Sequence, residues 1–481
     1  MVDFYSLIKF TESSHSAHGI VDSELTMKKH VIILGAGISG LSLAWYLNKK
    51  FADAIKITII EEKDISGGWI KSIRKDGFLF ELGPHSCRAS GTGLDTLQLI
   101  EELNLTNEVV CADSSAKKRY LYFDKHLHQV PGNLFSLLFS PVTKGLSWAL
   151  LKELSKPVAT LEDESIYDFF CRRFNQELTE RLIDPLVSGI YAGNIKNLSM
   201  ASCFSKLFEY EKQHGSLLKG MIYGKKTDEK HTDFVNHVKR HGLFSFRDGM
   251  DTLTKKLESF FRKSIIFSTK VHDLKIQENQ IIAGTDKGPI EADYFFNTAS
   301  ASAFAKIVQK TTPKLSLELN SIKYTSLISV NIGYSENVID QKGFGYLVPS
   351  KEKENILGCI WGSKVFPSQN NKTPETRLTV MLGGEHRPDI LSYNDEEIFN
   401  VVKKSIFQHL KIDKAPKACH IQRLVNAIPQ YPVGHRNKIK LIESELQRLG
   451  PIFCLGTALY GVSVNDCIVN ARKTALNLNF Y

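Results

Sequence analysis

The order of apolar and polar positions near the start of the chain predicts a strand, a helix and a second strand. Residues 31–34 are four consecutive apolar residues, mostly β-branched, as expected of a parallel strand buried on both faces. Apolar residues then recur at helical spacing over 41–47, and a second short apolar run follows at 57–60. This succession predicts an α/β unit with a parallel sheet.

Later segments change between helical and strand-like periods. The pattern predicts a helix over 94–105, a strand or a hairpin over 119–130 and an antiparallel sheet from alternating runs between 321 and 385. Near the C-terminus, a strand at 452–455 is followed by a glycine turn and a closing helix, as in the first unit. The antiparallel sheet could line a pocket or serve only as core.

The turn after the first strand is a candidate ligand site. Gly35, Gly37 and Gly40 have G-x-G-x-x-G spacing, which permits a tight turn, a close backbone approach to a diphosphate and a helix lying near the strand. The helix N-terminus adds partial positive charge. Glu61 follows the second strand, about 20 residues later, where a carboxylate can cap a ribose hydroxyl. The stretch predicts a dinucleotide site, suitable for NAD as well as FAD.

Length, charge and cysteine spacing limit the number of domains and the kinds of partner that we expect. With 481 residues the chain should form about two or three domains. Its formal charge of +9 suits an anionic lipid or substrate, or solubility alone, and the lack of a strong Lys/Arg block predicts no nucleic-acid partner. The eight cysteines show no metal or redox spacing, so we expect free thiols in a reducing compartment and no metal site.

Residues 131–154 are a candidate membrane contact. No apolar run reaches the ~18–20 residues of a spanning helix. The stretch instead holds two short apolar segments separated by Ser140 and Pro141, with lysines and Trp148 at the margins. Such segments can lie in a membrane interface or form the core of a helical subdomain. Residues 1–26 resemble neither a transit nor a signal peptide and are read as an extension without assigned function.

Motifs spread over residues 30–475 resemble a known family. GAGISG, E-E-x-x-x-x-GGW and F-E-L-G-P are similar to the N-terminal part of FAD-dependent oxidoreductases of the amine-oxidase type. The later segments resemble the oxygen-dependent protoporphyrinogen oxidases in particular; they are SIYDFFCRRF, GIYAGNIKNLSMASCF, GFGYLVPS, TVMLGG, IPQYPVGH and GVSVNDCI.

The resemblance implies a fold and a cofactor. It implies a Rossmann-like FAD-binding domain from 27–92, 240–300 and 418–481, and a mixed-sheet substrate domain from 206–239 and 301–417. A helical membrane-associated domain would be inserted over 93–205. The implied FAD contacts are Gly35, Ala36, Gly37, Ile38, Ser39, Gly40, Glu61, Glu62, Trp69, Gly83, Pro84, His85, Ser86, Val271, Val462, Ser463 and Val464.

The resemblance also implies a tetrapyrrole substrate, protoporphyrinogen IX, and molecular oxygen as electron acceptor. Arg119 would pair with a propionate, since a guanidinium fork binds both oxygens of a carboxylate, although a surface salt bridge would also explain this arginine. An apolar clamp on the macrocycle would consist of Phe344, Gly345, Leu347, Ile360 and Met381.

The expected reaction is a six-electron oxidation in three two-electron steps, with flavin N5 accepting hydride and with no acid–base residue assigned. Two alternatives remain: oxidation of coproporphyrinogen III, or a flavin-free module that binds prenylated partners. We expect peripheral attachment to the cytoplasmic face of a bacterial inner membrane, or to the mitochondrial inner membrane, and a homodimer stays open.

Overall fold

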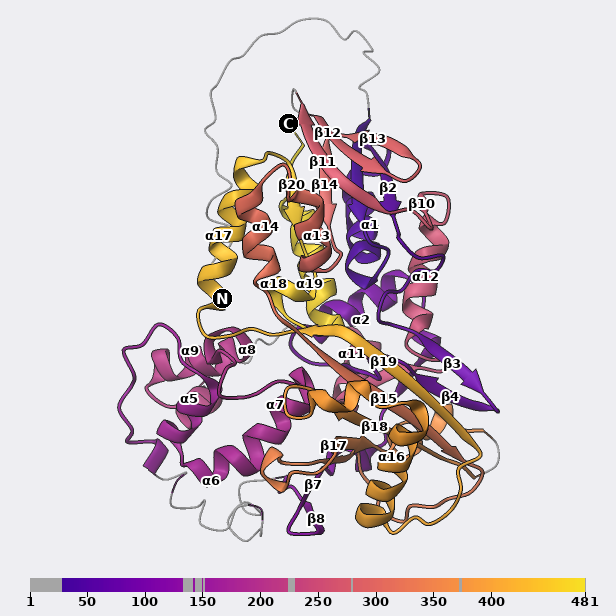
Figure 1. The fold of residues 1–481 in the computed structure, drawn as a ribbon, viewed down its shortest axis with the longest axis vertical. Coiled ribbons are helices and arrows are strands. Elements are labelled where there is room, and N and C mark those ends of the chain that lie inside the picture. Colours follow the sequence, from indigo (N-terminus) through magenta and orange to yellow (C-terminus); the bar gives the residue numbers. More distant parts are fainter. Residues whose placement is uncertain are drawn as a thin grey trace, which may run out of the picture.

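A computed structural model describes residues 28–132, 142, 149, 152–223, 230–277, 280–371 and 374–480. The extension 1–26 and most of the predicted membrane contact 131–154 lie outside these residues. Figure 1 shows a sheet with helices on both faces in the upper half, a larger sheet below it, and a group of helices beside the larger sheet.

The upper sheet contains the predicted first unit. Its five strands are all parallel, in the order β10 (Ile265–Ile266), β2 (Ile55–Ile60), β1 (Lys29–Leu34), β14 (Tyr294–Asn297) and β20 (Ile452–Cys454). Val31 and Ile33 point into one hydrophobic core, and Ile32 and Leu34 point into another on the opposite face. The predicted double burial is therefore confirmed, and the C-terminal strand joins the same sheet.

Helices cover both faces of the parallel sheet (Figure 1). One face packs against α1 (Ile38–Phe51), α2 (Gly93–Glu102), α11 (Asp233–His241), α12 (Asp251–Phe261) and α19 (Val464–Asn477). The other packs against α13 (Ala301–Val308), α14 (Pro313–Asn320), α17 (His435–Arg448), α18 (Thr457–Tyr460) and the antiparallel sheet of β11 (Val271–Gln277), β12 (Gln280–Thr285) and β13 (Gly288–Ala292).

The lower sheet has seven strands and mixed orientation. Its order is β19 (Ala418–Pro429), β15 (Tyr324–Tyr334), β18 (Thr376–Gly383), β17 (Ile356–Ile360), β16 (Gly345–Leu347), β7 (Tyr120–Phe123) and β8 (His126–Gln129). Only the β16–β7 pair is parallel. The predicted antiparallel sheet is confirmed. Of the two structures expected over 119–130, a strand or a hairpin, the structure shows the hairpin, and it belongs to this same sheet.

The two faces of the lower sheet differ. Leu378, Val380 and Leu382 of β18 share a core with α16 (Asp395–Leu410) on one face. Their neighbours Arg377 and Thr379 point to the opposite face, because side chains alternate along a strand. That opposite face lies toward β4 (Phe78–Glu81), which forms a hairpin with β3 (Ser72–Lys75).

A further group of helices lies beside the lower sheet, and most of them pack around a hydrophobic cluster that includes Phe169, Val187 and Phe208. The fully buried Arg173 is ion-paired there with Glu153 and Glu211. Within the part of the chain that the structure describes, no helix combines the length and apolar character needed to cross a bilayer. The helical group beside the lower sheet consists of α5 (Ile166–Arg173), α6 (Gln176–Leu178), the π-turn η5 (Thr179–Ile183), α7 (Asp184–Tyr191), α8 (Met200–Cys203), α9 (Ser205–His214) and α10 (Leu217–Tyr223).

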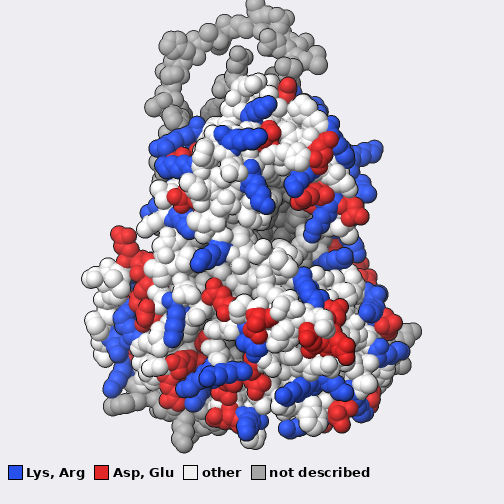
Figure 2. Space-filling model, viewed as in Figure 1, with Lys and Arg blue, Asp and Glu red and all other residues white. Residues whose placement is uncertain are grey.

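A small sheet connects the two halves. Its strand order is β5 (Cys87–Arg88), β9 (Leu243–Phe246) and β6 (Val109–Cys111). Basic and acidic side chains are interspersed over both halves on the face drawn in Figure 2. Charge on this face therefore does not separate the parallel-sheet half from the mixed-sheet half.

Candidate functional site

The glycine turn after β1 is held in a form that only glycine supports. Gly35 has φ +101°, and a Cβ at Gly40 would lie 2.0 Å from the carbonyl oxygen of Gly35. Helix α1 can therefore begin directly beside the end of β1. Gly37 is the N-cap and offers no side chain, so the N–H groups of the first turn, from Ile38 onward, face outward for a ligand's oxygens.

The GGW segment packs against this turn. Gly37 forms a bridge with Gly67, and the Gly67 amide donates to the Ala36 carbonyl at 2.9 Å. A Cβ at Gly68 would lie 3.3 Å from the Cα of Gly37. Three glycines, Gly37, Gly67 and Gly68, thus face one another, which leaves bare backbone for a diphosphate. We call Gly35–Gly40 with Gly67 and Gly68 the cradle.

Glu61 lies at one end of the cradle. Its Oε2 accepts from the Ala36 amide at 2.8 Å and its Oε1 from the Lys63 amide at 3.0 Å. The Thr269 amide donates to the Glu61 carbonyl at 3.0 Å, which brings the start of β11, and with it buried Val271, beside Glu61. Glu62 is exposed, with its carboxylate 3.7 Å from the Lys270 ammonium.

The remaining predicted cofactor residues lie on two other segments, the start of α19 and the chain from Trp69 to Ser86. Ser463 caps α19 by accepting from the Asp466 amide, Val464 is buried against α1, and Val462 is partly buried beside the helical cluster. Trp69 is 44% exposed, and a Cβ at Gly83 would lie 1.9 Å from its carbonyl oxygen. The chain from Gly83 through Pro84 therefore passes directly behind Trp69 and continues to His85 and Ser86.

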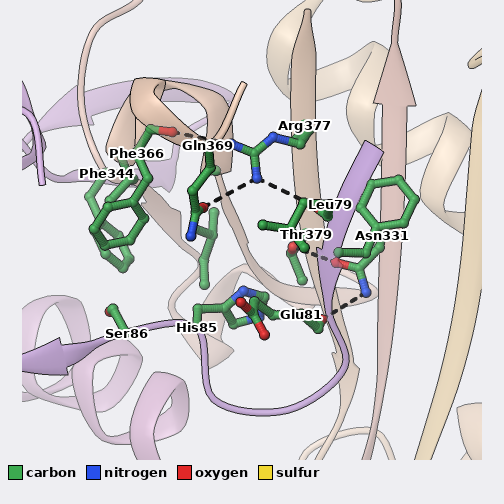
Figure 3. A pocket seen from close by; sticks show the side chains of 14 residues that line it. Leu79, Glu81, His85, Ser86, Asn331, Phe344, Phe366, Gln369, Arg377 and Thr379 are labelled. Atoms are coloured by element: carbon green, nitrogen blue, oxygen red, sulfur yellow. Dashed lines mark hydrogen bonds between the residues drawn. The ribbon is translucent and has the colours of Figure 1, made fainter. Parts of the chain in front are cut away.

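A pocket joins this turn to the lower sheet. Figure 3 shows Phe344 and Phe366 on one side of it, Arg377 and Gln369 on another, and Glu81 and His85 across from them. His85 and Ser86, predicted to contact the cofactor, and Phe344 and Ile360, predicted to contact the substrate, line the same cavity. The full lining is Leu79, Phe80, Glu81, His85, Ser86, Asn331, Phe344, Ile360, Gly362, Val365, Phe366, Gln369, Arg377 and Thr379.

Strand register places the other predicted substrate residues on the same face of the sheet. Gly345 is opposite Ile360, and Met381 is two residues beyond Thr379, whose side chain lines the pocket. Leu347 is two residues beyond Gly345 and packs against Leu121 and Leu182. Leu347 and Met381 therefore extend the face beyond the pocket, rather than lining it.

Arg119 is at the edge of this face. Its guanidinium carbon lies 5.2 Å from the centre of the Phe344 ring, and Phe344 is fixed by its amide donating to the Lys118 carbonyl at 2.9 Å. Burial lowers the pKa of Arg119, and the positive charge of Arg88 lowers it further. Among the described residues no carboxylate is ion-paired with Arg119, so the salt-bridge explanation has no observed partner there.

Polar residues that the sequence did not single out occupy the inner end of the pocket. Arg377 is buried, pairs with Glu375 at 3.0 Å and donates to the Leu79 carbonyl at 3.3 Å. The Asn331 side-chain amide donates to the Glu81 carbonyl at 3.1 Å. The bonds to Leu79 and Glu81 fasten β4 to the lower sheet. No local motif marks these two bonds, because each joins segments hundreds of residues apart.

Burial shifts the pKa values of two titratable groups of the pocket in the direction that favours the neutral form. Burial raises the pKa of Glu81 to about 7, although its carboxylate accepts from Ser72 Oγ at 2.6 Å and from the Met250 amide at 2.9 Å. Burial, together with the smaller effect of the Arg377 charge, lowers the pKa of His85 to about 4. At neutral pH the permanent positive charge of Arg377 therefore lies beside a neutral imidazole.

Comparison with known proteins decides the family. The profile of the flavin containing amine oxidoreductases matches residues 38–479. The chain belongs to this family. FAD is accordingly its cofactor, the cradle has the backbone form that a dinucleotide needs, and the protein is an FAD-dependent oxidoreductase.

Within the family, the chain is similar to enzymes that are named as oxidases of porphyrinogens. It is 34% identical to protoporphyrinogen oxidase of Bos taurus, over 93% of this chain and 98% of that one. It is 29% identical to coproporphyrinogen III oxidase of Bacillus subtilis (strain 168), over 92% and 96%. A solved structure from Exiguobacterium sp. 255-15 shares the fold, with a TM-score of 0.77 and 24% identity over 93% of this chain and 98% of that one.

Proposed function

We propose that this protein oxidises protoporphyrinogen IX to protoporphyrin IX, the last oxidation of the porphyrin ring before haem. The observation that carries the proposal is the pocket in which the turn at His85 and Ser86 meets Phe344 and Ile360 of the lower sheet. The 34% identity to a protoporphyrinogen oxidase over almost the full length of both chains supports the same substrate.

In this proposal the lower sheet positions the macrocycle. Phe344, Gly345, Leu347, Ile360 and Met381 present an apolar face of one sheet, which suits the face of a large flat ring. Arg119 at the edge of that face pairs with a propionate, and the nearby charge of Arg88 adds to the attraction. Together they fix which ring carbon points toward the cofactor.

The chain's own part in the chemistry is to bind, orient and exclude water. Bound flavin supplies two-electron oxidation, used three times for the six electrons of the overall reaction. We propose that the cradle, Glu61, Glu62, Trp69, Val271 and the 462–464 turn hold the dinucleotide, while Gly83 to Ser86 border its reactive ring. We assign no acid–base residue. Arg377 and the neutral His85 keep the inner end of the pocket polar.

Anaerobic mixing tests the proposal directly. Protoporphyrinogen IX added to the flavin-loaded protein should bleach the visible absorbance of oxidised flavin, because two electrons pass to each flavin. Porphyrin fluorescence should appear only once oxygen allows the three turnovers that six electrons need. Admitting oxygen should restore the flavin spectrum and yield three hydrogen peroxide molecules per porphyrin, which also tests oxygen as the acceptor. Unchanged flavin absorbance would overturn the proposal, and a purified protein without flavin would favour the binding-module alternative.

Coproporphyrinogen III is the second candidate substrate, because the chain is also 29% identical to a coproporphyrinogen III oxidase. That substrate carries four propionates and requires more cations around the macrocycle than Arg88 and Arg119 provide. Steady-state kcat/KM on both porphyrinogens separates the two. A higher kcat/KM for coproporphyrinogen III would make that compound the assigned substrate in place of protoporphyrinogen IX.

We further propose peripheral attachment to a membrane, on the cytoplasmic face of a bacterial inner membrane or on the mitochondrial inner membrane. The support is the apolar composition of residues 131–154, most of which lie outside the described residues. Replacing Leu137, Leu138 and Trp148 by serine should release the protein to the soluble fraction with its flavin retained. Unchanged partitioning would refute this role. A homodimer remains a prediction that sedimentation of the flavin-loaded protein checks.

A further inference from the structure

A cysteine and two histidines meet at the back of the small sheet that joins the two halves. One ligand atom from each of Cys111, His237 and His241 lies within 4.8 Å of the other two. Cys111 ends β6, whereas both histidines lie on α11, so segments far apart in the sequence form the group. The cysteine spacing gave no sign of it, because the partners are histidines.

The local structure holds these three side chains in a ligating arrangement. His237 and His241 are four residues apart on a helix, so they share one face, and their ring centres are 5.0 Å apart. Cys111 pairs in register with Phe244 of β9, and the Ala112 amide donates to the Leu243 carbonyl at 2.9 Å. Gly242, with φ +81°, turns the chain directly from α11 into β9. The helix end and the strand end are therefore tied together.

A backbone contact prepares one of the histidines for coordination. Nδ1 of His241 lies 3.1 Å from the carbonyl oxygen of Ala112. When Nδ1 donates its proton to that oxygen, Nε2 keeps the lone pair that a metal ion needs. Metal-bound histidines usually have such a second partner, which sets the tautomer and the ring orientation.

We propose that Cys111, His237 and His241 bind a divalent transition-metal ion of the Zn²⁺ type, with water as the fourth ligand. One thiolate and two imidazoles suit zinc, and three protein ligands with an open position are a known zinc arrangement. Ligand atoms around tetrahedral zinc are roughly 3.3–3.8 Å apart, by the usual bond lengths. The exposed His237 side chain can rotate to close the remaining distance.

The ion would fasten the corner behind the pocket. Val110 and Ala112, on either side of Cys111, pack in one hydrophobic cluster with Val365 and Phe366, both of which line the pocket. On β9, the carbonyl of Phe246 accepts from Gln369 Nε2 at 2.7 Å. Metal binding would therefore stiffen the support of the pocket wall without touching the wall itself.

Cobalt and zinc titrations of the full-length, flavin-loaded protein test the site. After chelator treatment and dialysis with a non-coordinating reductant, Co²⁺ should add visible bands to the red of the oxidised flavin spectrum, together with a thiolate-to-cobalt band. Both should saturate at one ion per chain and be lost when Zn²⁺ is added. Saturation without a thiolate band, or no binding, would overturn the proposal.

Variants assign the ligands. Cys111→Ser, His237→Ala and His241→Ala should each weaken Zn²⁺ binding, measured by calorimetry, by at least about 100-fold, because loss of a ligand exceeds the loss of an outer partner. The matched controls Cys171→Ser and His231→Ala should bind Zn²⁺ as the parent does. His237 is exposed, so His237→Ala retains the fold even if Cys111→Ser does not. Equal binding by parent and His237→Ala would rule the site out. Because the readout is metal binding, a failure here leaves the proposed oxidation untouched.

Discussion

The cradle comes almost entirely from residues 35–68, whereas the pocket takes side chains from β4, the lower sheet and the 362–369 segment. In the cradle, backbone groups would do the binding, and five of its eight residues are glycines. In the pocket, side chains from different strands converge on one face. The cradle should therefore fail through backbone clashes, and the pocket through loss of individual side chains or of strand register.

The largest effect is expected at Gly40. Its Cβ in Gly40→Ala would lie 2.0 Å from the Gly35 carbonyl oxygen and 2.8 Å from Thr298 Oγ1, so α1 must move away from β1. We expect a cost of at least about 4 kcal/mol, or about 10³-fold in FAD affinity. The ratio of flavin to protein absorbance after gel filtration measures it. Gly132→Ala, with open space around its Cβ, is the control, and full flavin content in Gly40→Ala would contradict the assignment of the cradle.

The next effect concerns pH and the pocket. Glu81 has a pKa of about 7 when folded, raised by burial, so the folded state holds its proton while the unfolded state releases it near its ordinary value. Its contribution to stability is present at low pH and is lost as pH rises toward 7. Glu81→Gln should therefore gain up to about 3 kcal/mol of unfolding free energy relative to the parent between pH 4 and pH 8.

Urea unfolding of both proteins across that pH range measures the difference. His85 contributes with the opposite sign, since burial lowers its pKa to about 4, but it is present in both proteins and drops out of the comparison. The exposed Glu162→Gln should give a difference that does not depend on pH. If Glu81→Gln behaved in the same way, burial would not raise the pKa of Glu81.

Gly345 tests strand register in the pocket. It has φ +139°, and a Cβ there would lie 2.1 Å from the Cys359 carbonyl oxygen on β17. Gly345→Ala should separate β16 from β17 and lower kcat/KM for protoporphyrinogen about 30-fold, or roughly 2 kcal/mol, with flavin content unchanged. Gly362→Ala, whose Cβ would meet nothing closer than 3.5 Å, serves as the control. Loss of flavin in Gly345→Ala would show that changes in the pocket also disturb the cradle.

The smallest effect is expected at Arg119. Arg119→Ala should raise KM for protoporphyrinogen about tenfold, roughly 1.4 kcal/mol for a partly exposed charge-assisted contact, with kcat nearly unchanged. Arg119→Lys should fall between, because an ammonium keeps the charge but not the fork. The exposed neighbour Lys117→Ala should have no effect. Steady-state assays measure both constants, and an unchanged KM in Arg119→Ala would contradict the proposed contact between Arg119 and a propionate.

The difference between the cradle and the pocket also explains which features could be predicted from the sequence. The glycine spacing, Glu61 and the strand period around them are local, so the sequence predicted the cradle and the parallel sheet. The resemblance implied Arg119 and Phe344 as separate substrate contacts. That they lie side by side could not be predicted, because it depends on the parallel pairing of β16 with β7. Arg377, Asn331 and Glu81 were missed, since each is polar in a strand and reveals its role only once it is buried against a distant segment.

The sequence by itself determined the α/β unit, the glycine turn that α1 requires and the alternation that gives each strand two faces. These features follow from steric limits and from periods of 2 and 3.6 residues, which act over neighbouring positions. Only the tertiary structure decided which faces meet: the polar end of the pocket and the group of Cys111, His237 and His241. Register, burial and the resulting pKa values of Glu81 and His85 depend on contacts between distant residues, and no local pattern encodes them.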